Sequence, residues 1–581
     1  MADAPAALSM TGAQALVRTI LAEDIEHVYG IVGGKLAPLL HAISAAPRLR
    51  FTGVRHEASG AMMAAAHNAG TGRVALALGE MGPGALNLAA GMGSAWGNNL
   101  ALLAITTNQH RAASYPHAGM FMDLDTLALM KPVAKWNATV GDARRSPALV
   151  RMALRHALSG RPGPVHLDVP QDVLTQTCEF AADTFEVAPA RYRATSCPRP
   201  AAVALQQAAD MLRGARRPLI VAGGGVVAAG AVAALRSLAR LMGAPVVPTQ
   251  MALGAVASDS QHFIGHGGII AGAPVWKAFA EADVVLAIGC RHSSWMWDSG
   301  GPLARRAQRM ISINLDPLAL GHPVLHDVAL QADALAALND LLEALGPDPR
   351  LAVEDGWLAR LVAARADYRA GLDRMADDAD PVMHPAALAR AIADALPDDA
   401  LAVFDGGHTT FWSNDFTPVR DVRTRFHEPG MSQLGFGLPY AMALKLAHPA
   451  RAVFNLTGDG SFGFTMNELD SARRHRLAVI NVIHNNESWG IIRSGQRAQL
   501  GFEMGTALEG SDYAAIARGF GCHGETVTRA GDVAGAIERA LASNLPAVLD
   551  CRTRFVPHPS MPGFGSMNRY GFEALTRVNA T

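Results

Sequence analysis

The sequence predicts an α/β protein with three doubly wound domains, each built on a parallel sheet. Three observations support this prediction: the length of 581 residues, an alternation of short apolar runs with Ala- and Leu-rich helical stretches, and two linker-like segments. At about 100–200 residues per domain, the chain is too long for a single hydrophobic core.

Short apolar or β-branched runs recur along the chain and are typical of buried strands. The predicted strands are Val74–Leu78, Leu102–Thr106, Pro164–Val169, Leu219–Ala222, Val284–Ile288, Met310–Asn314, Ala402–Phe404, Ala452–Leu456, Ala478–His484 and Ala547–Asp550. Helical patterns intervene, as in Ala13–Ala22, Ala58–Asn68 and Asp532–Ser543. This alternation predicts βαβ units, and therefore parallel sheets with helices on both faces.

Two segments are predicted to separate the domains. Phe180–Pro200 contains several prolines and little periodicity, and Gly346–Pro381 includes charged helical sequence at Leu351–Asp380. The predicted units are domains at 1–182, 196–345 and 382–560, followed by a tail or lid at 561–581.

Composition excludes several classes of protein. A formal net charge of −1 argues against broad attraction to nucleic acid or to anionic membranes. The five cysteines are scattered without a CxxC pair, which argues against a disulfide framework or a zinc site. They favour a reducing, cytoplasmic location, and Met1–Met10 has no basic start or long apolar run of a signal peptide.

One uncharged stretch, Pro218–Leu235, approaches the length of a membrane span. It contains Gly223, Gly224, Gly225 and Gly230, however, so a strand, a tight turn and an Ala-rich helix explain it better. We therefore expect no membrane partner.

The most informative motif is Gly458-Asp459-Gly460, which is followed after 24 intervening residues by Asn485-Asn486. The motif follows the predicted strand Ala452–Leu456, and ligands of doubly wound sheets bind at the carboxyl ends of strands. Its glycines allow a diphosphate to approach the backbone, and a helix beginning near Ser461 would direct its amide dipoles at the anion.

Asp459 and Asn486 can both supply oxygens to a hard cation. Mg²⁺ prefers a few protein oxygens together with phosphate oxygens, and two neighbouring strand ends would deliver them. The alternative is that the two motifs are unrelated turns, because both peptides are common in turns.

Together, at this spacing, the two motifs resemble the thiamine-diphosphate-binding signature of the family that includes acetolactate synthase, benzaldehyde lyase and pyruvate decarboxylase. The resemblance covers nearly the whole chain. It implies a pyrimidine-binding first domain, a middle domain and a diphosphate-binding third domain, with thiamine diphosphate and Mg²⁺ as cofactors. It also implies that Gly458, Gly460 and Ser461 contact the cofactor, and that the backbone carbonyl of Ser488 joins Asp459 and Asn486 around the metal.

The same resemblance assigns a catalytic role to Glu57, within Arg55-His56-Glu57-Ala58-Ser59-Gly60. Without it, Glu57 could be an ordinary first-turn residue stabilised by the helix dipole. With it, Glu57 should hydrogen-bond the pyrimidine ring and generate the imino tautomer, which removes the thiazolium proton. A buried, partly protonated carboxyl would suit this role.

Two loops resemble further cofactor contacts of the family. Gly82 and Asn87 lie in Gly82-Pro83-Gly84-Ala85-Leu86-Asn87, and Leu434 falls where relatives place a bulky apolar residue between the two cofactor rings. Leu434 could also be an ordinary core residue. In relatives the glutamate and the diphosphate site come from different subunits, so the resemblance implies a homodimer or homotetramer with active sites at the subunit interface.

The third domain resembles benzaldehyde lyase most, at Asn485–Gly490, Ser511–Tyr513, Gly519–Gly521 and Asp405–Trp412. The interpretation is therefore a carbon–carbon lyase or carboligase acting on 2-hydroxy ketones, aldehydes or 2-oxo acids. The alternative is an acetolactate-synthase-like decarboxylating carboligase or a 2-oxo acid decarboxylase.

Several positions depart from these relatives. Lys35 and Thr410 replace a His and a Tyr of benzaldehyde lyase, and Phe121-Met122-Asp123 replaces the Phe-Gln-Glu of acetolactate synthase. The adjacent His pair of pyruvate decarboxylases is missing, since only isolated His110 and His117 occur nearby. The candidate pocket residues are Gly34, Lys35, Met122, His408 and Trp489. Lys35 could attract a substrate carboxylate, or it could be a solvated lysine at a helix start.

Two rival functions remain weaker. Gly223-Gly224-Gly225 imitates a dinucleotide turn, but an NAD dehydrogenase would leave Glu57 and the third domain unexplained. A non-catalytic paralogue is disfavoured because Glu57, Asp459 and Asn486 are all present. Whether FAD, an ADP-like ligand or nothing occupies the middle domain is left open.

Overall fold

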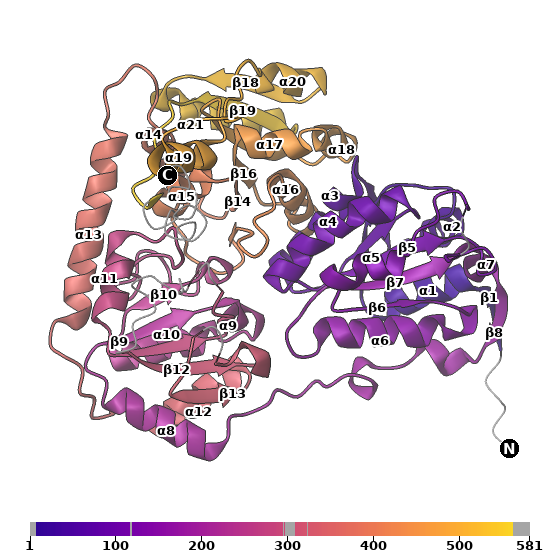
Figure 1. Ribbon diagram of the computed structural model, residues 1–581, viewed down its shortest axis with the longest axis horizontal. Helices are drawn as coiled ribbons and strands as arrows, with labels where there is room; N and C mark the ends of the chain where they lie inside the picture. The colour runs from indigo at the N-terminus through magenta and orange to yellow at the C-terminus, as the bar shows by residue number, and fades with distance from the viewer. Residues whose placement is uncertain (1–6, 117–118, 294–295, 297–307, 322–323, 562–581) are drawn as a thin grey trace, which may run out of the picture. The chain divides into compact units, whose positions relative to one another are not determined.

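Three parallel sheets organise the protein, and helices lie on both faces of them (Figure 1). The computed structural model describes residues 7–116, 119–293, 296, 308–321 and 324–561. His117 and nearly all of the predicted tail or lid, from residue 562 onward, lie outside the described residues. The three parallel sheets confirm the predicted fold class.

The described chain forms two compact units. The first comprises residues 7–196 together with 428–450 and 465–477, and the second comprises 197–427, 451–464 and 478–561. The domain boundaries derived from the sequence remain predictions.

The first unit contains a six-stranded parallel sheet in the order β3-β2-β4-β5-β7-β6. Its strands are β2 (His27–Gly30), β3 (Arg50–Gly53), β4 (Leu76–Gly79), β5 (Leu103–Asn108), β6 (Trp136–Thr139) and β7 (Val165–Pro170). Its helices are α1 (Gly12–Ala22), α2 (Ala37–Ser44), α3 (Glu57–Thr71), α4 (Pro83–Asn98), α5 (Thr126–Met130), α6 (Ser146–Leu158) and α7 (Gln171–Thr175). A small antiparallel pair joins β1 (Leu8–Thr11) to β8 (Thr177–Phe180).

Local sequence explains the helix that carries Glu57. The ring of His56 accepts a hydrogen bond from the backbone N–H of Ala58 and caps α3, and Gly72 ends the helix at a φ of 76°. Small residues on α3 allow close packing against α4, since a Cβ atom on Gly91 of α4 would lie 2.3 Å from the carbonyl oxygen of Ala58. The start of α3 is therefore rigidly placed.

The second unit contains the other two parallel sheets. The middle sheet has the order β10-β9-β11-β12-β13, with β9 (Pro218–Ala222), β10 (Val246–Pro248), β11 (Val284–Ile288), β12 (Arg309–Asn314) and β13 (Val328–Gln331). Its helices are α8 (Ala202–Arg213), α9 (Gly224–Ala228), α10 (Val232–Met242), α11 (Ala273–Glu281) and α12 (Ala334–Leu345), followed by α13 (Trp357–Ala376). The predicted helical stretch Leu351–Asp380 is thus confirmed as α13.

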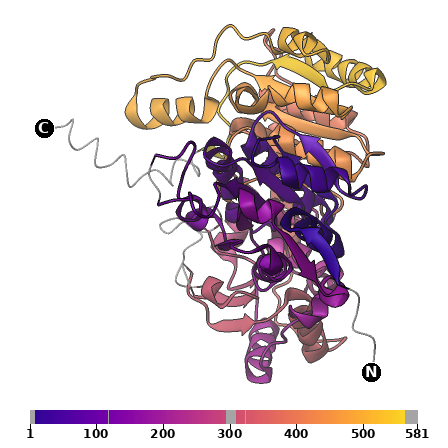
Figure 2. The same ribbon diagram turned by 90° about the vertical axis from the view of Figure 1, so that its right-hand side faces the viewer.

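The third sheet has the order β15-β14-β16-β17-β19-β18, and Figure 2 shows its strands lying between helices in the orange-to-yellow part of the chain. Its strands are β14 (Leu401–Asp405), β15 (Arg425–Phe426), β16 (Val453–Gly458), β17 (Val479–Asn485), β18 (His523–Val527) and β19 (Ala547–Arg552). The helices of this part of the chain are α14 (Pro385–Ala395), α15 (His408–Phe416), α16 (Gly437–Ala447), α17 (Asp459–Thr465), α18 (Glu468–Arg474), α19 (Gly490–Leu500), α20 (Tyr513–Gly519) and α21 (Val533–Ser543).

Each of the ten predicted strands overlaps an observed one, because these runs are fully buried between helical layers. Two helices are found where the topology alone would not place them: α16 and α18 belong to the first unit, where α16 packs along α3. Within the described residues, no helix is long and apolar enough to cross a membrane.

Candidate active site

Glu57 lies at the first position of α3 and is buried, with 7% of its surface exposed. The side-chain amide of Asn87, on α4, donates a hydrogen bond to Glu57 Oε2 at 2.9 Å. The other oxygen, Oε1, lies next to Gly84, where an added Cβ atom would approach it to 3.1 Å. Asn87, predicted as a cofactor contact, therefore contacts the predicted catalytic carboxyl itself.

A second carboxyl holds the turn that precedes Glu57. Glu468, at the start of α18, is fully buried and accepts hydrogen bonds from the backbone N–H groups of Arg55 (3.0 Å) and His56 (3.1 Å). Burial raises the pKa of Glu468 above its usual range. Sequence reasoning missed this residue, because an acidic residue in a first helical turn gives no sign that it will be buried.

Gly82 and Met122, both predicted site residues, are neighbours. Gly82 has a φ of 63°, and a Cβ atom there would lie 2.9 Å from the carbonyl oxygen of Met122. Met122 itself has a positive φ of 61°. The turn before α4 thus requires glycine both for its conformation and for the close approach of the Met122 backbone.

The loop between β2 and α2 carries Gly34 and Lys35. Gly34 is exposed, whereas Lys35 is half-buried and its ammonium group donates to Gln171 Oε1 at 2.7 Å. Whether Lys35 is a solvated lysine at a helix start or attracts a substrate carboxylate stays a prediction, and Gln171, at the start of α7, is the hydrogen-bond partner of its ammonium group. The backbone N–H of Lys35 donates to Glu80 Oε2 at 2.9 Å.

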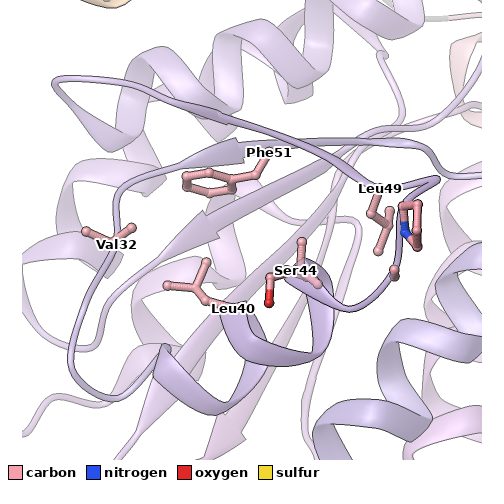
Figure 3. Close-up of a pocket in the computed structure, with 8 residues that line it drawn as sticks. Val32, Leu40, Ser44, Leu49 and Phe51 are labelled. Carbon is pink, nitrogen blue, oxygen red and sulfur yellow. The ribbon is translucent and has the colours of Figure 1, made fainter.

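An apolar pocket of about 280 Å³ adjoins the same loop (Figure 3). It is lined by Val32, Leu40, Ile43, Ser44, Ala46, Pro47, Leu49 and Phe51. Because none of these side chains titrates near neutral pH, the pocket cannot supply acid–base chemistry.

Leu434 also belongs to the first unit, in the turn before α16. A fully buried carboxyl, Glu428, accepts hydrogen bonds from the backbone N–H groups of Met431 (2.9 Å) and Gln433 (2.8 Å). The Asn98 side chain also donates to Glu428. The position of Leu434 is therefore set by a second buried carboxyl that sequence reasoning missed.

In the second unit, Asp459 and Asn486 meet as predicted from the order of the strands. β16 and β17 are parallel neighbours, and Gly458 is paired with His484. The backbone N–H of Ser488 donates both to Asp459 Oδ2 (3.0 Å) and to Asn486 Oδ1 (3.1 Å). The side-chain oxygens of Asp459 and Asn486 therefore converge on the backbone N–H of Ser488.

The side chains of Asn485 and Asn486 have different hydrogen-bond partners. The Asn485 amide donates to Asp550 Oδ1 at 2.8 Å, on the buried side of the sheet, whereas Asn486 turns toward Ser488. The helix after β16 begins at Asp459, not near Ser461 as predicted. The strand runs as far as Gly458, and the Asp459 carboxylate already accepts the Gly460 N–H, at 2.9 Å, in the first helical turn.

Burial raises the pKa of Asp459 to about 7, although the backbone N–H groups of Gly460 and Ser488 oppose this shift. A divalent cation beside the carboxyl would reverse the effect, because a nearby positive charge favours the ionised form. An acidic group held in this way is a candidate functional residue.

Gly406 and Gly460 lie around Asp459, and we refer to the surface that they form as the cradle. A Cβ atom on Gly406 would lie 3.1 Å from Ser461 Oγ, and one on Gly460 would lie 2.5 Å from the Trp489 ring. Trp489, predicted to line the substrate pocket, therefore packs directly on Gly460. Ser461 Oγ is buried and has no hydrogen-bond partner among the described residues. The cradle, this free hydroxyl and the nearby oxygens of Asp459 and Asn486 fit a diphosphate with a divalent cation.

His408 begins α15 beside this cradle. Burial lowers the pKa of His408 to about 3, so its ring is neutral at pH 7. Its Nε2 lies 3.4 Å from Ser494 Oγ, while Nδ1 is buried and has no partner among the described residues. A Cβ atom on Gly490 would lie 3.2 Å from both His408 Nδ1 and Asn486 Nδ2, so these two side chains face the same glycine.

The glycine-rich turn of the middle domain is built differently. The backbone N–H of Gly225 donates to the carbonyl oxygen of Gly289 at 3.2 Å, and a Cβ atom on Gly223 would lie 2.3 Å from that oxygen. Its glycines therefore serve close packing of two strand ends.

Known protein families match most of the chain. The chain matches three models of thiamine pyrophosphate enzymes, a synonym of thiamine diphosphate enzymes: the N-terminal TPP binding domain at residues 10–129, the central domain at 205–341 and the C-terminal TPP binding domain at 405–551.

Curated relatives align with nearly the whole chain. A probable acetolactate synthase large subunit of Methanocaldococcus jannaschii is 28% identical over 558 residues, covering 93% of this chain and 91% of the relative. The acetolactate synthase of Mycobacterium avium is 28% identical, covering 92% and 86%. An acetolactate synthase large subunit of Parasynechococcus marenigrum is 30% identical over 562 residues, covering 95% and 89%. The chain therefore belongs to the family of thiamine-diphosphate-dependent enzymes that includes acetolactate synthase.

Proposed function

We propose that this enzyme is an acetolactate-synthase-like carboligase, which releases CO₂ from a 2-oxo acid and joins the remaining fragment to a second carbonyl compound. The observation that carries the proposal is the similarity over nearly the full length to proteins named acetolactate synthase. These comparisons favour the decarboxylating alternative over the benzaldehyde-lyase-like interpretation, to which they give no support.

The second unit supplies the anchoring groups. Asp459, Asn486 and the Ser488 carbonyl would hold Mg²⁺, and Gly458, Gly460 and Ser461 would receive the diphosphate. The convergence of Asp459 and Asn486 on the Ser488 N–H supports this assignment. His408, whose neutral ring keeps Nδ1 available beside the cradle, would donate or accept one further hydrogen bond.

The first unit supplies proton transfer. When bound, thiamine diphosphate supplies the nucleophilic carbon and the electron sink for carbon–carbon cleavage. Because Asn87 donates to Glu57 Oε2, that oxygen remains an acceptor, and the proton of a neutral Glu57 resides on Oε1. Oε1 is thus the atom at which Glu57 gives and takes a proton, and Glu468 keeps the preceding turn in place.

The proposal also includes the roles expected from the sequence for Leu434 and for the residues of the substrate pocket. Leu434 would support the bent cofactor, and Gly34, Lys35 and Met122 would face the substrate. We extend the proposal to a homodimer or homotetramer in the cytoplasm. FAD in the middle domain is not part of it, because the Gly225 N–H is already bonded to Gly289.

The test is a product assay on protein reconstituted with thiamine diphosphate and Mg²⁺. Pyruvate, benzoylformate, benzoin and acetoin are offered separately, and CO₂, aldehydes and ligated products are measured against a cofactor-free control. Cofactor-dependent CO₂ release with a ligated product supports the proposal. Aldehyde release from benzoin or acetoin without CO₂ from either 2-oxo acid would replace it with the lyase.

Glu57→Gln provides the matched variant, since it preserves size and removes the proton donor. We expect kcat to fall by about 10²–10⁴-fold while cofactor affinity changes only a few-fold. An unchanged turnover rate would contradict the assigned role.

A further inference from the structure

Glu80, at the carboxyl end of β4, binds the loop that carries Lys35. Glu80 Oε2 accepts hydrogen bonds from the backbone N–H groups of Lys35 (2.9 Å) and Leu36 (3.4 Å). Glu80 Oε1 accepts from the Met81 N–H (3.1 Å) and from the hydroxyl of buried Thr107 (2.8 Å). Four donors occupy the acceptor sites of one carboxylate, so Glu80 fixes the backbone of this loop.

The Glu80 carboxylate leaves no space for a side chain at Gly33. A Cβ atom on Gly33 would lie 2.0 Å from Glu80 Oε2. Glu80 also flanks the same glycine as Glu57: a Cβ atom on Gly84 would lie 3.2 Å from Glu80 Cβ and 3.1 Å from Glu57 Oε1. The Lys35 loop is therefore tied, through Glu80 and Gly84, to the edge of the sheet where Glu57 lies.

The Lys35 ammonium forms no ion pair with any of the residues that the structure describes. Its partner within the described part of the chain is the neutral amide of Gln171, at 2.7 Å. An ammonium group has three donors, so two of them are available to a ligand. The Glu80 oxygens accept hydrogen bonds from the backbone and from the Thr107 hydroxyl, and the Lys35 ammonium forms no ion pair with Glu80.

We propose that Lys35 forms an anion subsite that recognises the carboxylate of a 2-oxo acid, and that Glu80 is the positioning residue that holds the subsite in place. The inference rests on the proposed function, and it adds the residue that recognises the carboxylate next to the reacting carbonyl of the donor. A charge-assisted hydrogen bond from Lys35 selects such anions over neutral ketones and aldehydes of the same size.

The experiment compares the binding of lactate and lactamide to the Mg²⁺- and thiamine-diphosphate-loaded enzyme by isothermal titration. The two probes share a skeleton and differ in charge, and neither has the carbonyl group that the reaction consumes. We expect wild type to prefer lactate, and Lys35→Met to reduce the lactate affinity by about 10-fold or more while the lactamide affinity changes less than about 2-fold. Lys35→Arg should retain the preference.

Two further variants test whether the lactate preference depends on Lys35 in particular and on the position of its loop. Lys277→Met removes an exposed lysine of α11 and should leave the lactate preference intact. Gly33→Ala retains Lys35 but forces the loop away from Glu80, so it should reduce the preference while the bound fraction of thiamine diphosphate is unchanged.

The outcomes separate the two proposals. A lactate preference that survives in Lys35→Met, or that is missing in wild type, overturns the anion subsite even if CO₂ is released from pyruvate. Loss of the preference in Lys35→Met supports the subsite even if no 2-oxo acid is decarboxylated, in which case the proposed reaction fails alone.

Discussion

Two glycine-rich turns of the second unit follow buried parallel strands, yet they are built for different purposes. After β9, Gly223-Gly224-Gly225 packs backbone against backbone, with the Gly225 N–H bonded to Gly289. After β16, Gly458-Asp459-Gly460 packs against side chains, namely Thr409, Trp489 and the Ser488 turn. Each turn has a glycine N–H that is paired within the fold, Gly225 with Gly289 and Gly460 with Asp459. The second turn differs in its buried carboxyl and in the following Ser461 hydroxyl, which has no partner among the described residues.

The difference shows that glycine content alone does not make a phosphate site. An anion site needs polar groups that the fold leaves available. The distinguishing feature of the second turn is the partner motif on the next strand, since Asp459 and Asn486 both accept from the Ser488 N–H, whereas the neighbour of Gly224 among the described residues is the Met251 side chain. Four variants test this difference between the two turns.

Asp459→Gly should have the largest effect, because it gives the turn at 458–460 the Gly-Gly-Gly sequence of the turn at 223–225. It removes the carboxyl that would hold Mg²⁺, so we expect kcat/KM to fall by about 10³-fold or more. Steady-state assays at saturating Mg²⁺ and thiamine diphosphate measure this loss. Activity within a few-fold of wild type would show that Asp459 does not hold the metal.

Gly223→Ala should come next and should act on stability alone. Its Cβ atom would lie 2.3 Å from the Gly289 carbonyl oxygen, and backbone cannot yield cheaply, so we expect a loss of about 2–3 kcal/mol in unfolding free energy. Urea unfolding measures the loss, and cofactor affinity should be unchanged. Impaired thiamine diphosphate binding in a folded variant would contradict the division of roles.

The pH dependence of stability provides the third test. In the cofactor-free protein, burial raises the pKa of Asp459 from 3.8 to about 7. A raised carboxyl pKa contributes stability below about pH 4, and that contribution is lost as the pH rises to about 7. Wild type should therefore lose stability relative to Asp459→Asn over this range, by on the order of 2–4 kcal/mol. If the difference in unfolding free energy between wild type and Asp459→Asn stayed constant from pH 4 to 8, it would count against a buried, protonated Asp459.

Gly224→Asp should have the smallest effect. It gives the first turn the sequence Gly-Asp-Gly, at a cost of about 1 kcal/mol or less, because its Cβ atom approaches the Met251 side chain to 3.0 Å. Calorimetry should detect no additional Mg²⁺ or thiamine diphosphate site. A second cofactor site in this variant would mean that the turn sequence is sufficient by itself.

Ten strands could be predicted from the sequence because each is a mainly apolar run that is buried in the fold. Shorter or more polar strands, such as β2, β3 and β6, were not predicted. The meeting of Asp459 and Asn486 could also be predicted, since neighbouring parallel strands end at one edge of the sheet. The start of α17 was predicted two residues too late, because glycines on both sides of Asp459 suggested a longer turn.

The buried carboxyls could not be predicted. Glu80, Glu428 and Glu468 are charged and look like surface residues in sequence. Glu428 and Glu468 are nevertheless buried and Glu80 is half-buried, and each accepts backbone N–H groups from remote or unpredicted turns. Glu468 and Arg55 are separated by 413 positions. Such pairings depend on α18 joining the first unit, which no local pattern indicates.

The central claim is that the Gly458–Asp459–Gly460 turn, and not the Gly223–Gly225 turn, receives the cofactor. The most direct test titrates thiamine diphosphate with Mg²⁺ into wild type, Asp459→Asn and Gly223→Ala, and follows tryptophan fluorescence, because Trp489 packs on Gly460. We predict saturable quenching in wild type and Gly223→Ala, and an affinity at least about 10-fold weaker in Asp459→Asn. Equal affinity in wild type and Asp459→Asn would contradict the account.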